Sequence, residues 1–93
     1  MNTQNPIISQ VWNKGRIISG YPSSVWRYDD CGAVIKWSDY GNRNSKFGWE
    51  IDHIMPESRG GRDILPNLRP LQWENNMSKS NGQLVCVRSQ RSL

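Results

Sequence analysis

The amino-acid sequence predicts a small single domain of the α+β class. The chain has 93 residues, two segments alternate like half-buried strands, and one later segment has a helical pattern. The strands are expected at 31–37 and 47–54, and the helix from 73 to 79 or 80. Residues 1–93 form one domain, because a shorter part would be too small to bury a core.

The first part of the chain has weak patterns. Residues 1–10 are polar and are expected to be flexible. Residues 11–19 mix apolar and basic side chains, which predicts a short helix or turn followed by an extended segment. Residues 21–24 (YPSS) have the composition of a turn, and Ser24 is a candidate cap for a helical turn over residues 25–27.

The strand at 47–54 has the clearest pattern. Its alternation puts Trp49, Ile51 and His53 on one face and Glu50 and Asp52 on the other. Pro56 follows and ends the strand.

After this strand, glycine, proline and asparagine residues mark the boundaries of the expected elements. Residues 57–67 contain two glycines and a proline and predict an ordered loop. Residues 68–71 predict a short strand, and Pro70 favours a sheet edge. Asn81-Gly82 is a stop signal for the helix, and residues 84–87 predict a short strand or a packed extension.

The composition limits the partners and the compartment. Twelve Lys and Arg, eight of them Arg, against eight Asp and Glu give a net charge of +4. This charge is compatible with binding to nucleic acid, an anionic membrane or an acidic protein. It is equally compatible with a charge excess that only keeps the protein soluble. No apolar run approaches the ~20 residues of a membrane span, and no signal peptide is recognised, so a cytoplasmic location without membrane contact is expected.

Two cysteines, Cys31 and Cys86, are too few for a disulfide scaffold. Two free thiols are expected, with one long-range disulfide as the alternative.

The residues between Trp49 and Lys79 carry the chemistry. Hydrolysis of a phosphodiester needs a base for water, a cation to neutralise developing charge, and groups that hold the phosphate. His53, the one histidine of the chain, has the side chain that accepts a proton near neutral pH. Asp52 is a hard oxygen ligand of the kind that Mg²⁺ takes, and asparagine can add an uncharged oxygen.

The segment GWEIDHIMPESRGGRDILPNLRPLQWENNMSKS resembles the HNH endonucleases, a branch of the ββα-metal nucleases. The resemblance covers about residues 47–80, and a CG…YGNRNS pattern extends it back to Cys31. It implies a ββα-metal core, in which a two-stranded antiparallel hairpin with a long loop precedes a helix. An N-terminal strand and helix segment would cover this core.

The resemblance also implies a role for each matched residue. His53 would be the general base, and Asn67 would tie the loop together and orient that base. Asp52 and Asn76 would hold one divalent cation, Mg²⁺ or Mn²⁺, with Asn75 as the alternative to Asn76. Candidate contacts to the nucleic acid are Lys79, Arg59, Arg62 and Arg69, and for the three arginines an ordinary surface role is an equal alternative.

The chain departs from relatives that bind structural zinc through two CxxC knuckles. Gln72 and Asn75 stand at one pair of knuckle positions, and Tyr28 and Cys31 stand at the other. Structural Zn²⁺ is therefore not expected. Support for the fold is expected instead from four tryptophans, Trp26, Trp37, Trp49 and Trp73.

The function expected from this resemblance is metal-dependent cleavage of the DNA backbone, with nicking and low sequence specificity. DNA is favoured over RNA, and a monomer or a weak homodimer is expected. One alternative is a catalytically silent nucleic-acid-binding module. Another is a nuclease toxin or effector that an inhibitor or a larger complex controls.

Overall fold

The computed structural model describes residues 5–80 and 82–89, and these residues form an α+β domain. The described part contains a three-stranded sheet, a two-stranded sheet and two short α-helices, with 3₁₀ turns between them. The α+β class predicted from the sequence is confirmed.

The three-stranded sheet is antiparallel, in the order β1 (Arg16–Ile17), β2 (Trp26–Tyr28), β3 (Val34–Lys36). The predicted helical turn over residues 25–27 is wrong, because Trp26–Tyr28 pair with β3. The strand predicted at 31–37 is shorter, since the start of this range lies in a turn closed by Gly32 N–H to the carbonyl of Asp29 at 2.9 Å. A 3₁₀ turn, η1 (Trp37–Asp39), follows β3 directly.

The second sheet is an antiparallel pair of β4 (Trp49–His53) and β5 (Leu68–Gln72). Both strands lie within one or two residues of their predicted ends. The register pairs Asp52 with Arg69 and His53 with Leu68. Pro70 is compatible with this sheet because both of its strands are edges.

The loop between β4 and β5 contains two 3₁₀ turns, η2 (Glu57–Arg59) and η3 (Leu65–Asn67). Helix α2 (Trp73–Met77) follows β5 at once and is shorter than predicted, ending at the C-cap Ser78. Of the predicted Asn81-Gly82 stop, Asn81 lies outside the described residues.

Helix α1 (Pro6–Trp12) corrects the expectation that residues 1–10 are flexible, as far as residues 5–10 are concerned. Residues 1–4 lie outside the described part. The helix begins where the side chain of Asn5 accepts the N–H of Ile7 at 3.0 Å, with Pro6 in the first turn. Its apolar face is buried, so packing holds a helix that is too short to persist alone.

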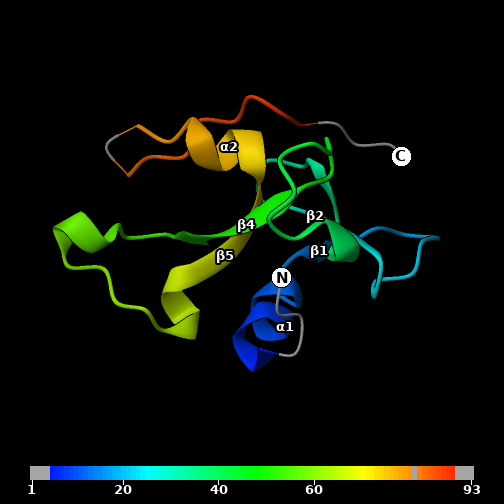
Figure 1. Cartoon of the computed structure of the whole chain (residues 1–93), viewed down its shortest axis with the longest axis horizontal. Helices are drawn as coiled ribbons and strands as arrows, with labels where there is room; N and C mark the ends of the chain where they lie inside the picture. Colours follow the sequence, from blue (N-terminus) through cyan, green and yellow to red (C-terminus); the bar gives the residue numbers. More distant parts are fainter. Residues whose placement is uncertain (1–4, 81, 90–93) are drawn as a thin grey trace.

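The hydrophobic core lies between α1, β3 and the β4–β5 hairpin. Its buried members are Ile8, Val11, Trp12, Ile35, Trp49 and Leu68. The Trp49 ring lies 5.2 Å from the Trp12 ring and 4.8 Å from the Tyr40 ring, between centroids. Helix α1 and helix α2 lie on opposite sides of the hairpin (Figure 1), so β4 turns one face to the aromatic core and the other to α2.

The two cysteines form a disulfide, so the expectation of free thiols is wrong. Cys31 and Cys86 lie 5.5 Å apart between Cα atoms and are separated by 55 residues. They meet because residues 84–87 are a mostly exposed extension that returns past α2 and is bound there by Asn75, without a strand in this range. Closing a loop of this length removes about 4 kcal/mol of conformational freedom from the unfolded chain.

Neither helix in the described ranges has the length and apolar run that crossing a membrane requires.

Candidate functional site

The residues singled out from the sequence gather around the end of β4. Asp52 and His53 are the last two residues of that strand, and Asn67 ends the turn η3 that leads into β5. Asn76 lies in α2, and Lys79 lies two residues after it ends.

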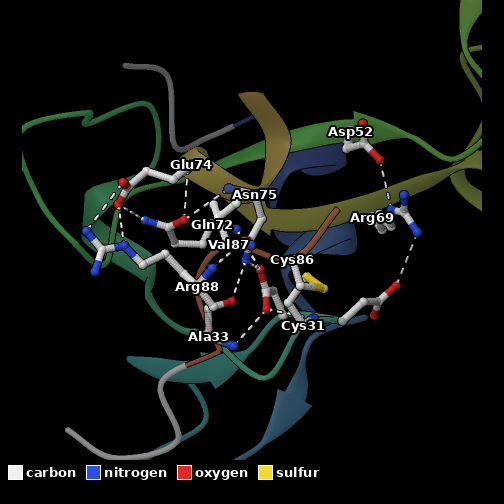
Figure 2. Close-up of a disulfide and its surroundings, with 12 residues drawn as sticks. Cys31, Ala33, Asp52, Arg69, Gln72, Glu74, Asn75, Cys86, Val87 and Arg88 are labelled. Atoms are coloured by element: carbon white, nitrogen blue, oxygen red, sulfur yellow. Dashed lines mark hydrogen bonds and ion pairs between the residues drawn. A yellow bond between two sulfur atoms is a disulfide. The ribbon is translucent and has the colours of Figure 1, made fainter. Parts of the chain in front are cut away.

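Asp52 is buried, with 5% of its surface exposed, and both of its carboxylate oxygens meet a cation. Lys79 Nζ donates to Oδ1 at 2.6 Å, and Arg69 Nε donates to Oδ2 at 2.8 Å. Arg69 reaches Asp52 across the hairpin and also lies 3.5 Å from Asp30 (Figure 2 shows its link to Asp52). Two cations thus stabilise a carboxylate that would otherwise be costly to bury.

His53 lies half-buried at the edge of this cluster, with 25% of its side chain exposed. Its Nε2 lies 3.2 Å from Oδ1 of Asp63, an exposed residue of the β4–β5 loop. Its backbone carbonyl accepts a hydrogen bond from Lys79 Nζ at 2.8 Å. The imidazole is therefore accessible, while the backbone beneath it is fixed by the same lysine that binds Asp52.

Asn67 connects the two ends of the β4–β5 loop through its side chain. Its Oδ1 accepts the N–H of Met55 at 2.8 Å, and its Nδ2 donates to the carbonyls of Met55 and Arg62 at 3.0 and 2.9 Å. The backbone carbonyl of Asn67 also accepts the N–H of Ile54. These bonds fix the chain directly after His53.

The two neighbouring asparagines of α2 face different parts of the molecule. Asn76 Nδ2 donates to Oε1 of Glu50 at 2.9 Å, on the α2-facing side of β4. Asn75 is fully buried and binds Asp29 together with the backbone of residues 87 and 88. Asn76 is thus the one directed to β4, and Asn75 belongs to the scaffold.

Glu50 joins the site through Asn76 and through Arg43, whose guanidinium donates to both carboxylate oxygens at 2.7 and 3.0 Å. Burial pushes the pKa of Glu50 up, but the hydrogen bonds from Arg43 and Asn76 and the charge of Arg43 outweigh it. The pKa of Glu50 therefore lies below its ordinary value. The carboxylate stays ionised at neutral pH.

The three arginines differ in placement. Arg59 and Arg62 are exposed in the β4–β5 loop, and within the described residues neither guanidinium forms an ion pair. The side chain of Arg69 is only 13% exposed and is held between Asp52 and Asp30. Its guanidinium group is engaged by these two carboxylates and is mostly buried.

The oxygen donors near α2 fit a hard divalent cation by their chemistry. Asp52, Asn76 and Glu50 supply two carboxylates and one amide, the ligand types of Mg²⁺ and Mn²⁺. Among the described residues no group of three His, Cys, Asp or Glu side chains is arranged as a metal centre. Lys79 Nζ already binds Asp52 Oδ1, so a cation at this oxygen would lie close to the ammonium group of Lys79.

Sequence reasoning missed two features beside the site. Asp63 is one, although it stands in the loop that carries the GG pair. The other is the buried Asp29, which accepts from Cys31 N and Ala33 N at 2.9 and 2.8 Å. A signal existed there, because an aspartate just before a Cys-Gly turn is typical of a side chain that caps the turn.

A cavity of about 340 Å³ lies elsewhere in the molecule, lined by residues of α1, β2 and η1 that include Trp12, Arg27 and Trp37. It contains none of the residues predicted for chemistry. The buried Arg27 donates to three backbone carbonyls there, which accounts for its position structurally.

Comparisons with known proteins find no matching family model, no matching curated protein and no matching solved structure.

Proposed function

We propose that the protein is a divalent-metal-dependent endonuclease of the HNH type that hydrolyses the backbone of DNA. The observation that carries the proposal is the meeting of the two ends of the motif. Lys79 Nζ, beyond α2, binds both the Asp52 carboxylate and the backbone carbonyl of His53, at the end of β4. Residues at the two ends of the resembling segment therefore share one small volume.

The ordinary chemistry of these side chains supports a hydrolytic site. His53, with its accessible ring, would take the proton from the attacking water. Asp52 and Asn76 would hold the cation, with Glu50 beside Asn76 as an additional carboxylate. A cation bound there would neutralise charge on the phosphate and on the leaving 3′-oxygen.

Two exposed arginines and the partly buried Lys79 would bind phosphate groups. Arg59 and Arg62 project from the loop that begins after His53, and Lys79 would contact a phosphate once it leaves Asp52. Contacts of this kind position the backbone and read no bases, so low sequence specificity follows.

The decisive test is incubation with supercoiled plasmid and Mg²⁺ or Mn²⁺, with and without a chelator. Wild-type protein should produce open circles before linear DNA, because one site cuts one strand at a time. His53→Ala should be slower by roughly 10²–10⁴-fold, the usual contribution of a general base. Ser58→Ala, in the exposed turn η2, is the matched control and should cut like wild type.

A catalytically silent nucleic-acid-binding module is the second candidate, favoured by the full engagement of Asp52 with two cations. DNA binding with no cutting in any divalent cation would support it and exclude the nuclease. A toxin or effector role under a partner's control would leave the cutting chemistry unchanged.

A cytoplasmic location stays a prediction. The Cys31–Cys86 disulfide bears on it, because disulfides persist mainly in oxidising compartments.

A further inference from the structure

Residues 82–89, the tail segment, run past α2 (Figure 1). Besides the backbone pairing of Gln83 with Ser80, three contacts fix this segment to the rest of the molecule (Figure 2). The first is the disulfide from Cys86 to Cys31. The second is the buried side chain of Asn75 in α2. The third is an ion pair between Arg88 and Glu74, with atoms 2.7 Å apart.

Asn75 uses its whole amide group to join three parts of the chain. Its Oδ1 accepts the N–H groups of Val87 and Arg88, both at 2.8 Å, and its Nδ2 donates to the carbonyl of Arg88 at 2.9 Å. The same Nδ2 donates to Asp29 Oδ2 at 3.0 Å. Because the amide is fully buried, losing any of these partners leaves polar atoms unsatisfied.

Asp29 extends this connection to the turn that carries Cys31. Its Oδ1 accepts the N–H groups of Cys31 and Ala33, and its Oδ2 accepts the N–H of Gln72, the residue that caps α2. The disulfide therefore closes a ring that runs through the Cys31 turn, Asp29, Asn75 and the tail segment. Figure 2 shows Cys31, Asn75, Cys86 and Val87 converging beside α2.

Helix α2 is held by this ring on its Asn75 side, while its first residue, Trp73, donates to the carbonyls of Gly48 and Ser45. The helix has five residues, too few to be stable by itself. The face with Asn75 is held by the ring, and the neighbouring residue Asn76 meets Glu50 of β4. Lys79, two residues beyond the helix, then reaches Asp52.

Apart from the disulfide and the hydrogen bonds from Asn75, the contacts of the tail segment are at the surface. Arg88 is half-exposed, and an exposed ion pair contributes little. Val85 and Val87 are 42% and 53% exposed, so the segment has little apolar burial at these positions. The disulfide at Cys86 is the one covalent restraint on the tail segment besides the chain itself, and it lies next to the residues that Asn75 binds.

We propose that the Cys31–Cys86 disulfide is a redox-controlled latch that positions α2, and that its reduction by a dithiol switches the site off. The latch itself follows from the contacts of the tail segment. The effect on cutting rests on the proposed nuclease function.

The exchange can be written with all atoms and electrons. A reductant thiolate attacks Sγ of Cys86, the exposed partner, and Cys31 leaves as a thiolate that takes up a proton. The second thiol of the reductant, losing its proton, displaces Cys86. Two electrons and two protons pass to the protein, and the reductant becomes a disulfide; a disulfide oxidant reverses the process.

The experiment compares oxidised protein, protein reduced with a dithiol, and Cys86→Ser, using hydrogen exchange and plasmid nicking in parallel. On reduction, exchange in residues 73–79 and 82–89 should rise at least tenfold, while β2–β3 and β4–β5 keep their protection. Nicking should fall at least tenfold, and reoxidation should restore both. Cys86→Ser should behave like reduced protein with or without the dithiol, which separates the latch from any effect of reductant on the assay.

Arg88→Gln is the matched control, because it removes only the exposed ion pair and should stay latched. Unchanged exchange in 73–79 after complete reduction overturns the latch. Loss of protection in both sheets also overturns it, since the disulfide would then hold the whole fold. Raised exchange in 73–79 with unchanged nicking overturns the link to the site. An oxidised wild type that never cuts contradicts the nuclease proposal, whereas its exchange pattern still tests the latch.

Discussion

Lys79 Nζ lies 2.6 Å from Oδ1 of Asp52 and joins the end of the α2 region to the end of β4. The ammonium also binds the backbone carbonyl of His53. One cation thus touches both residues of the Asp-His step, and any divalent ion at Asp52 Oδ1 must compete with it.

Lys79→Met should therefore raise the affinity of the DNA-free protein for Mn²⁺ and slow the cutting of DNA. Removing a neighbouring positive charge should strengthen cation binding by roughly three- to thirtyfold, as for a charge pair near a protein surface. A calorimetric Mn²⁺ titration measures the first effect, and plasmid nicking measures the second. Lys46→Met, at an exposed lysine, is the control. Unchanged or weaker Mn²⁺ binding by Lys79→Met would contradict the competition.

Asn67→Ala should loosen the loop after His53. The change removes the three side-chain bonds to Met55 and Arg62, and since these positions are exposed, water replaces part of the loss. A cost of about 1–2 kcal/mol is expected, seen as a lower unfolding temperature. The nicking rate should fall even at temperatures where the variant is fully folded, because the backbone directly after His53 is less firmly held. If Asn67→Ala and the exposed control Asn44→Ala had the same unfolding temperature and the same nicking rate, this role of Asn67 would be refuted.

Glu50 should add stability at neutral pH that disappears in acid. Its pKa is lower in the folded protein than its ordinary value of 4.5, so folding favours the ionised form. This contribution is fully present above the unfolded pKa and is lost as pH falls through the folded pKa. The stability difference between wild type and Glu50→Gln should shrink as pH falls below about 4.5, in thermal unfolding at a series of pH values.

Arg43→Gln tests the cause of this pH dependence, because Arg43 supplies both a hydrogen bond and a charge to Glu50. The difference in unfolding free energy between Arg43→Gln and wild type should shrink over the same pH range. A difference that stays constant from pH 6 to pH 3 for both variants would mean that Glu50 is not stabilised in this way.

Arg59 and Arg62 should set part of the salt dependence of DNA binding. Each phosphate contact contributes about −0.9 to the slope of log affinity against log salt on duplex DNA. Changing both arginines to glutamine should reduce the steepness by about 2, with similar effects on unrelated sequences. Arg16→Gln, on β1 of the other sheet, should leave the slope unchanged. A change confined to one DNA sequence would instead indicate base readout.

The local patterns were sufficient for the β4–β5 hairpin and the start of α2. The alternation around Trp49–His53 and the edge-compatible Pro70 correspond to β4 and β5 within one or two residues. Helix α1 was missed, although Asn5-Pro6 is a favourable start, because the polar composition around it suggested a flexible end.

Partners far apart in sequence could not be predicted in this way. Cys31 and Cys86 are 55 residues apart, and two cysteines alone do not reveal whether they meet. Asp29 and Asn75 are 46 residues apart, and neither belongs to a local pattern that points to the other. For the candidate site, the sequence indicated Asp52, His53 and Asn76, but the engagement of Asp52 by Lys79 and Arg69 depends on how β4, β5 and α2 pack.

The two adjacent asparagines of α2 have different partners because of their positions around the helix axis: Asn75 binds the backbone of Val87, and Asn76 binds Glu50. Successive residues of an α-helix are rotated by about 100°, so Asn75 and Asn76 project to different neighbours despite being identical in type. Insertion of one residue before them would keep the same two letters side by side but rotate both by about 100°, so that each would project where the following residue projects now. The side chain that clamps the backbone near Val87 would then turn away, and the one that meets Glu50 would no longer reach it. A change of this kind alters the composition very little, but it removes Asn75 from its contact with the tail segment and Asn76 from its contact with Glu50.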